Sequence, residues 1–404
     1  MKDGMESIVK DERLLRQLAC YSFAVMIITI CISLAIQSRE TQERLIQEQD
    51  ATREQEEFYA EVTPPVTPYA EVYAQGGHAA EDEVWEVWQF LSKDTMEELM
   101  EEIDDQCVLI RKPKGNSLFW EISENLPYYK ITFTVYGAED AVYAASVLRF
   151  LGENYYYGLP DEEEIMKDLS VLSYLEGEQI VSEINMTFDK CYVPTVTEQE
   201  EYYILNLRKY SEVYERLIVL DAGHGGKDPG AGAENYRVKE ADITLKLLLY
   251  LKELLEENTD IAVFCTRTED VYPTLQERAN LALGLEADLF ISWHCNASES
   301  TSRRGTEVIF NAEQGKENSF NSRIFALLCL DKLLDALGTR DSGITNRQDL
   351  HIVRRATMPV VLIETAYLSN RRDLAILKND TKLQDAAYAV YEAILEAYDL
   401  MEEN

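Results

Sequence analysis

The 404-residue sequence predicts an α/β protein: a mixed, largely parallel sheet flanked by helices, preceded by a small β-rich α+β domain and an N-terminal transmembrane helix. In the C-terminal half, apolar β-branched runs alternate with longer segments of helical spacing, which is typical of a sheet covered on both faces. Near the N-terminus, one uncharged run is long enough to cross a membrane. The formal net charge of −36 argues against nucleic acid as a partner, because phosphate contacts need clustered Lys and Arg.

The N-terminal segment predicts a membrane anchor. Residues 18–36 read LACYSFAVMIITICISLAI and carry no charge. As a helix they would span roughly 28 Å, close to the ~30 Å hydrocarbon core of a bilayer. A cleaved signal peptide or a buried core helix is the alternative, but the run is long for a signal peptide and no small-residue cleavage site follows it. We therefore expect a cytoplasmic segment at 1–17, an uncleaved signal-anchor at 18–38, and the rest of the chain outside the cytoplasm.

Between the anchor and the C-terminal half, two further parts are expected. Residues 39–82 are polar and then contain three prolines and a Gly pair, so they read as a stalk and linker. Residues 83–215 read as an α+β accessory domain of unknown role, with helical spacing at 83–103. Its β-rich runs are 107–110, 128–136, 180–188 and 202–207.

The C-terminal part, residues 216–404, supplies the predicted α/β sheet. Its expected strands are 217–222, 261–266, 288–294, 306–310 and 360–365. Its expected helices are 238–255, 275–285, 320–337 and 373–398. The chain's seven cysteines are odd in number and contain no C-x-x-C, so neither a disulfide framework nor a cysteine zinc site is indicated.

Two histidines lie where predicted strands end. His224 follows the first strand in GHGGKDPG, and His294 ends DLFISWH. Sites in open α/β sheets form outside the carboxyl ends of strands, so these side chains can meet. Glu240, in the first turn of the next helix, completes a set of two imidazoles and one carboxylate that suits Zn²⁺. Glu364 is a lone acid in the apolar run PVVLIE and could act as a general base there.

Simpler interpretations stand beside this one. The Gly-rich loop could bind phosphate, although it lacks the G-x-x-x-x-G-K-[ST] spacing. Glu240 could be only a helix-dipole partner. Glu364 could be a buried ion-pair partner, for instance of Arg354. Residue spacing alone leaves these alternatives open.

Six sequence blocks carry a resemblance to a known family. They are LIVLDAGHGGKDPGA, VKEADITLKL, FCTRTEDVYPTLQERANLA, ADLFISWHCNA, RRGTEVIF and LHIVRRATMPVVLIETAYLSN. In this order and spacing they resemble the zinc-dependent N-acetylmuramoyl-L-alanine amidases of the type-3 family, across residues 217 to about 400. These enzymes cleave the amide between N-acetylmuramic acid and the first alanine of the peptidoglycan stem peptide.

The resemblance implies roles for individual residues. It places the ligands of one zinc ion on His224, Glu240 and His294. It makes Glu364 the catalytic glutamate, and it gives Arg354 the task of holding the substrate or the active-site carboxylate. Asn296 is the second residue that we expect to contact the substrate.

Together these features predict a membrane-anchored peptidoglycan hydrolase at the bacterial cell membrane, crossing it once, with its catalytic domain extracytoplasmic. Two alternatives are a catalytically silent wall-binding regulator with the amidase fold, and a zinc peptidase. The segment between Glu307 and Asn321 is too short for the inhibitory helix that regulated relatives carry near this position. Control would then act through residues 83–215, by a protein activator or a targeting partner.

Overall fold

The computed structural model describes residues 106–142, 147–151, 154–157, 164–233, 237–314 and 319–402. The predicted anchor at 18–38, the stalk at 39–82 and the helix at 83–103 lie outside these ranges. Among the described helices, none combines the length and the apolar character needed to cross a membrane.

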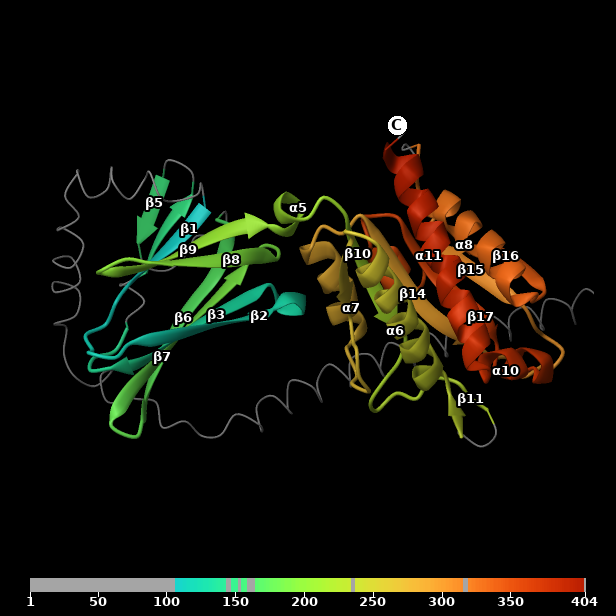
Figure 1. Ribbon diagram of the computed structural model, residues 1–404, viewed down its shortest axis with the longest axis horizontal. Helices are drawn as coiled ribbons and strands as arrows, with labels where there is room; N and C mark the ends of the chain where they lie inside the picture. Colours follow the sequence, from blue (N-terminus) through green and yellow to red (C-terminus); the bar gives the residue numbers. More distant parts are fainter. Residues whose placement is uncertain are drawn as a thin grey trace, which may run out of the picture. The chain divides into compact units, whose positions relative to one another are not determined.

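The described part of residues 106–209, here called the β-rich segment, forms two antiparallel sheets (Figure 1). One sheet has the order β5-β4-β1-β9-β8 and the other β2-β3-β7-β6. The strands of the first sheet are β1 Gln106–Arg111, β4 Val147–Leu151, β5 Asn154–Tyr157, β8 Tyr192–Glu198 and β9 Tyr202–Lys209. Those of the second are β2 Phe119–Asn125, β3 Lys130–Ala138, β6 Met166–Glu176 and β7 Gln179–Phe188.

Both sheets contribute to one apolar core. Ile110 of β1 and Tyr203 of β9 lie in the same buried cluster as Phe133 of β3 and Ile184 of β7. The four β-rich runs that the sequence predicted correspond to β1, β3, β7 and β9. The prediction began the second run too early, because a 3-10 turn, η1 (Leu126–Tyr128), occupies its start. The short helix α5 (Tyr210–Val213) then leads towards the C-terminal part.

A six-stranded sheet organises the C-terminal part and confirms the predicted mixed, largely parallel arrangement. Its order is β13-β10-β14-β17-β15-β16. The first four strands run parallel, β15 runs antiparallel to β17, and β16 runs parallel to β15. The strands are β10 Leu217–Ala222, β13 Ala262–Cys265, β14 Leu289–Asn296, β15 Thr306–Phe310, β16 Asp341–Asn346 and β17 Val360–Tyr367. A two-stranded ribbon is formed by β11 Gly232–Ala233 and β12 Val238–Lys239.

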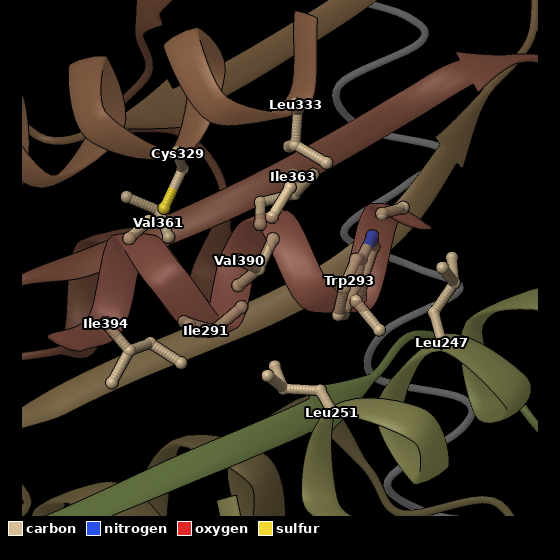
Figure 2. Packing of buried hydrophobic residues seen from close by; sticks show 14 of the residues in the cluster. Leu247, Leu251, Ile291, Trp293, Cys329, Leu333, Val361, Ile363, Val390 and Ile394 are labelled. Atoms are coloured by element: carbon tan, nitrogen blue, oxygen red, sulfur yellow. The ribbon is translucent and has the colours of Figure 1, made fainter. Parts of the chain in front are cut away.

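Helices cover both faces of this sheet. On one face, the core joins side chains of α6 (Glu240–Asn258), α8 (Ser322–Leu337) and α11 (Asp380–Glu402) to alternate strand residues. Figure 2 shows Ile291 and Trp293 of β14 within this core, near Leu251, Cys329 and Val390. On the other face, Phe290 lies in a cluster with residues of α7 (Leu275–Gly284) and α9 (His351–Arg355). The helix α10 (Arg371–Leu377) contacts β17.

Alternation along β14 places Trp293 and Cys295 in the core beneath α6, α8 and α11, on the opposite face from His294. Two of the predicted helices have different bounds in the structure. The helix expected from residue 238 begins at Glu240, after β12, and the helix expected at 373–398 is two helices. The break between them follows from Asn379, whose side chain accepts hydrogen bonds from the backbone amides of Thr381 and Lys382 and so caps a new helix.

Candidate metal centre

Three predicted residues meet at the carboxyl ends of β10 and β14. One ligand atom each from His224, Glu240 and His294 lie within 4.8 Å of one another. His224 Nε2 is 3.2 Å from Glu240 Oε2, and His294 Nδ1 is 2.9 Å from Glu240 Oε1. Glu240 is only 4% exposed, yet it begins α6 and so enters the site from the helix N-terminus. The geometry fits a cation held by two imidazoles and one carboxylate.

Two glycines make room for this cluster. A Cβ at Gly223 would lie 2.3 Å from Cε1 of His294. A Cβ at Gly230, whose φ is +64°, would lie 2.6 Å from Cδ2 of His224 and 2.7 Å from Oε2 of Glu240. His224 itself has a φ of +63°, which is uncommon for a residue with a side chain. Gly223 and Gly230 therefore allow the loop backbone to pack closely against the candidate ligands, where a side chain would collide with them.

Asp228 orients one of these imidazoles. His224 donates from Nδ1 to Asp228 Oδ2 across 2.6 Å, which leaves Nε2 directed at Glu240. Burial raises the pKa of Asp228, but hydrogen bonds from His224 and from the Gly230 amide outweigh it and lower that pKa. A carboxylate behind a ligating histidine fixes its tautomer and ring orientation. The sequence analysis did not single out Asp228, although it lies in the GHGGKDPG loop.

The charges of the cluster favour a shared proton when no cation is present. Burial opposes ionisation of Glu240, but hydrogen bonds from His224 and His294 hold its pKa well below its usual range. Burial lowers the pKa of His224, but Glu240 and Asp228 more than reverse this and raise it to about 9. A metal ion must displace that proton from His224, and Glu240 would then bind the cation while Asp228 keeps its hydrogen bond to His224.

Two buried arginines, also missed from sequence, hold the loop that carries His224. Arg278 of α7 donates to Asp221 Oδ1 (2.6 Å) and to the carbonyl oxygens of Ala222 (2.7 Å) and His224 (2.8 Å). Arg267 donates to the carbonyl oxygens of Ala222 and Gly223. Each arginine is 3% exposed. Their only signal in the sequence is a charged residue within a half-apolar block, and the residues of the His224 loop that they bind lie at least 44 positions away.

Glu364 lies beside the cluster on the neighbouring strand. It is the register partner of His294 in the parallel pair of β14 and β17. Its Oε2 atom is buried and has no hydrogen-bond partner in the part of the chain that the structure describes. Burial is the main cause that raises the pKa of Glu364 to about 7, with Glu240 and Glu307 adding to it and His294 opposing it. Such a carboxyl group can exchange a proton near neutral pH.

The two expected substrate contacts have different surroundings. Asn296 donates from Nδ2 to Glu307 Oε2 (3.2 Å). Glu307 is the register partner of Glu364 on β15, and the sequence analysis missed it. Arg354 is an exposed residue of α9 and forms no ion pair with Glu364. The alternative of a buried Glu364–Arg354 pair is therefore wrong, because α9 leaves the arginine at the surface.

A hollow opens beside the candidate ligands. Its polar wall includes His224, Asp228 and His294. The other wall is formed by Tyr272, Pro273, Leu275 and Ile352, from the loop before α7, the start of α7 and α9. A substrate amide can therefore reach the cluster from solvent. This combination of a metal-binding set, a neighbouring buried carboxyl group and an open approach defines a candidate metal-dependent hydrolase site.

Comparisons with known proteins identify the family. A family model described as N-acetylmuramoyl-L-alanine amidase matches residues 218–396. An endolysin of Bacillus phage SPP1 is 36% identical over 186 residues, which make up 46% of this chain and 67% of the endolysin. LytC, an N-acetylmuramoyl-L-alanine amidase of Bacillus subtilis (strain 168), is 33% identical over 186 residues, 36% of its own length. The chain belongs to the N-acetylmuramoyl-L-alanine amidase family, as the sequence blocks predicted.

A solved structure is also similar. The catalytic domain of CwlV, an N-acetylmuramoyl-L-alanine amidase from Bacillus (Paenibacillus) polymyxa var. colistinus, has 32% sequence identity to this chain. The match covers 46% of this chain and 99% of that domain, with a TM-score of 0.43.

Proposed function

We propose that this chain is a membrane-anchored, zinc-dependent peptidoglycan hydrolase that cleaves the amide between N-acetylmuramic acid and the L-alanine of the stem peptide. The observation that carries the proposal is the adjacency of His294 and Glu364. A candidate metal ligand and a buried carboxyl group, one of whose oxygens has no partner within the described ranges, occupy paired positions on neighbouring strands. Family membership supplies the substrate class.

The residues of the chain divide the work as follows. His224, Glu240 and His294 hold the ion, and Asp228 fixes the ring of His224. When bound, Zn²⁺ supplies Lewis acidity, which makes water a stronger acid and favours negative charge on the carbonyl oxygen of the scissile amide.

Glu364 performs the proton transfers in this mechanism. It takes a proton from the attacking water through Oε2, since that atom has no competing partner among the described residues, and returns the proton to the departing alanine nitrogen. With a pKa raised to about 7, Glu364 is suited to both steps near neutral pH. We place Asn296 and Arg354 at substrate contacts beyond these groups, Asn296 through its position two residues after His294 and Arg354 through its exposure on α9.

The anchor at 18–38 and the linker at 39–82 belong to the same proposal. They would hold the enzyme at the cell membrane by a single span, with the catalytic part outside the cytoplasm and within reach of the inner wall. Residues 83–215 would receive a protein activator or a targeting partner. Cleavage of added protease sites in the linker of intact cells without an outer permeability barrier tests this placement, and full protection of those sites would contradict it.

Product analysis tests the chemistry. The full chain is incubated with purified peptidoglycan, with and without chelator, and the products are identified by mass spectrometry. We expect chelator-sensitive release of stem peptides that begin with a free L-alanine amino group and leave muramic acid intact. Cleavage within the stem peptide would indicate a zinc peptidase. Zinc binding without any product would indicate the catalytically silent wall-binding regulator.

A further inference from the structure

Helix α7 links the candidate metal centre to a second set of contacts. Through Arg278 it holds Asp221 and the carbonyl oxygens of Ala222 and His224, as described above. The helix has ten residues, and a helix this short has little stability of its own in water. Its position must therefore be set by what packs against it.

The β-rich segment provides much of that packing. Tyr128 of η1 donates to Glu277 Oε1 (2.7 Å), the residue next to Arg278. Asn280 donates from Nδ2 to the carbonyl oxygen of Pro127 (3.1 Å). At the end of α7, the amide of Cys191 donates to the carbonyl oxygen of Gly284 (2.9 Å). Turns at two separate places in the β-rich segment thus hold both ends of the helix.

Tyr129 also packs closely against α7. A Cβ at Gly284 would lie 2.2 Å from Cε1 of Tyr129, so the ring rests directly on the helix backbone. Tyr129 has a φ of +55°, and its amide donates to the carbonyl oxygen of Leu126 (3.0 Å), so the turn itself aims the ring. Burial is the main cause that raises the pKa of Tyr129 to about 12.

An apolar cluster joins the same elements. Buried Cys191 and Tyr210 share it with Leu281 and Ala282 of α7. Leu126 and Tyr129 pack against this cluster from η1 and the residue after it. The contact is therefore a packed interface and not a set of isolated surface hydrogen bonds.

We propose that the β-rich segment is a positioning element for the metal centre: through Tyr129 and η1 it holds α7 in the place from which Arg278 fixes the loop bearing His224. Tyr129 is a positioning residue, since it acts through α7 and touches neither metal nor substrate. This inference rests on the proposed function for its catalytic consequence, but its effect on metal binding is independent of turnover.

The test uses the full chain and the variant Tyr129→Asn. Asparagine tolerates a positive φ, so the turn is kept while the ring is lost. The matched control is Phe119→Asn, which removes an exposed ring of the β-rich segment that stacks on Tyr136 and not on α7. Three quantities are measured: hydrogen exchange of the α7 amides, the zinc dissociation constant, and kcat with KM on peptidoglycan fragments.

We expect Tyr129→Asn to speed exchange in α7, to raise the zinc dissociation constant and to lower kcat by roughly tenfold with a smaller change in KM, since small misplacements of a catalytic group lower rate strongly. Phe119→Asn should leave all three as in the wild type. Unchanged exchange in α7 would overturn the proposal, and so would faster exchange with unaltered zinc binding and kcat.

A second variant approaches the contact from the helix. Gly284→Ala drives a Cβ into the Tyr129 ring, so it should reproduce the defect, and in the Tyr129→Asn background its added effect should be smaller, because only the approach to Cys191 Sγ (2.8 Å) remains. Full additivity of the two changes would contradict a shared contact. If the wild-type chain releases no stem peptide, the proposed function fails, whereas exchange and zinc binding still decide the role of the β-rich segment.

Discussion

The imidazole of His224 and the carboxylate of Asp228 form a 2.6 Å hydrogen bond four residues apart, on the side of the ring that faces away from Glu240. The bond is possible because the chain reverses between them. The amide of Gly225 donates to the carbonyl oxygen of Asp228 (2.8 Å), and the amide of Asp228 returns the bond (2.9 Å). Metal affinity should therefore depend on a residue that is not itself a ligand.

Replacing Asp228 by Asn tests this relationship. The amide no longer stabilises positive charge on His224 and no longer selects one tautomer, so we expect zinc affinity to fall by roughly 10–100-fold. Titration with a competing chelator measures it. Asp270→Asn is the control, because Asp270 accepts from the Gly226 amide in the same loop without contacting a histidine. Equal affinity of the Asp228 variant and the wild type would remove Asp228 from the site.

Glu364→Gln tests the proton transfers. Glutamine has nearly the same shape and cannot accept a proton at neutral pH, so the zinc content should stay while kcat falls by roughly 10²–10⁴-fold. Metal analysis and turnover of a muramyl peptide measure the two effects on one sample. The control is Glu307→Gln, which alters the register partner of Glu364 and should change kcat far less. Undiminished turnover of the Glu364 variant would exclude it as the general base.

The residues of the candidate metal centre and the neighbouring Glu364 could be picked out from sequence because strand ends and residue types are local properties. His224, His294 and Glu364 each follow or end an apolar strand, and Glu240 opens a helix. Parallel strands bring such ends to one edge of a sheet. The exposed position of Arg354 could not be predicted, since it depends on α9, a five-residue helix with no periodic signal of its own.

The supporting residues depend on contacts between distant segments. Arg278 meets the His224 carbonyl across 54 residues, and Glu307 meets Glu364 only because β15 pairs antiparallel with β17. The edge strand β16 was also missed, since DSGITN is polar and mostly not buried and so lacks the pattern of a core strand. The α/β class is thus encoded locally, whereas the charge network beneath the site is encoded by tertiary pairing.

Zinc affinity should rise with pH until His224 loses its proton. The pKa of this histidine in the metal-free chain is about 9, above its ordinary value of 6.5, because Glu240 and Asp228 stabilise the charged ring against the effect of burial. Since metal displaces the proton, affinity should increase by up to about tenfold per pH unit below that value and level off above it. Zinc affinities that do not change with pH across this range would contradict the prediction that zinc displaces a proton from His224.

The raised pKa of His224 also predicts how the stability of the metal-free chain depends on pH. A histidine whose folded pKa is raised contributes stability that is complete below pH 6.5, and this contribution is lost as the pH rises through about 9. Chelator-treated chain should therefore unfold at lower denaturant concentration at the alkaline end of this window. The variant His224→Gln, which cannot titrate, should lack this part of the decline.

Gly230→Ala should weaken metal binding, while the same change at Gly338 should not. Both glycines have a positive φ, +64° and +63°, so each alanine would strain the backbone by about 1–2 kcal/mol. At Gly338 a Cβ meets no atom within 4 Å, whereas at Gly230 it would lie 2.7 Å from Glu240 Oε2. In the metal-free state, both variants should have a lower free energy of unfolding than the wild type, as measured by denaturant unfolding. Chelator titration should show weaker zinc binding only for Gly230→Ala, because only there does the methyl group displace two candidate ligands. Equal zinc affinity in both variants would mean that the loop backbone adjusts to the methyl group without moving His224 or Glu240. Close packing at Gly230 would then not be needed to position the candidate ligands.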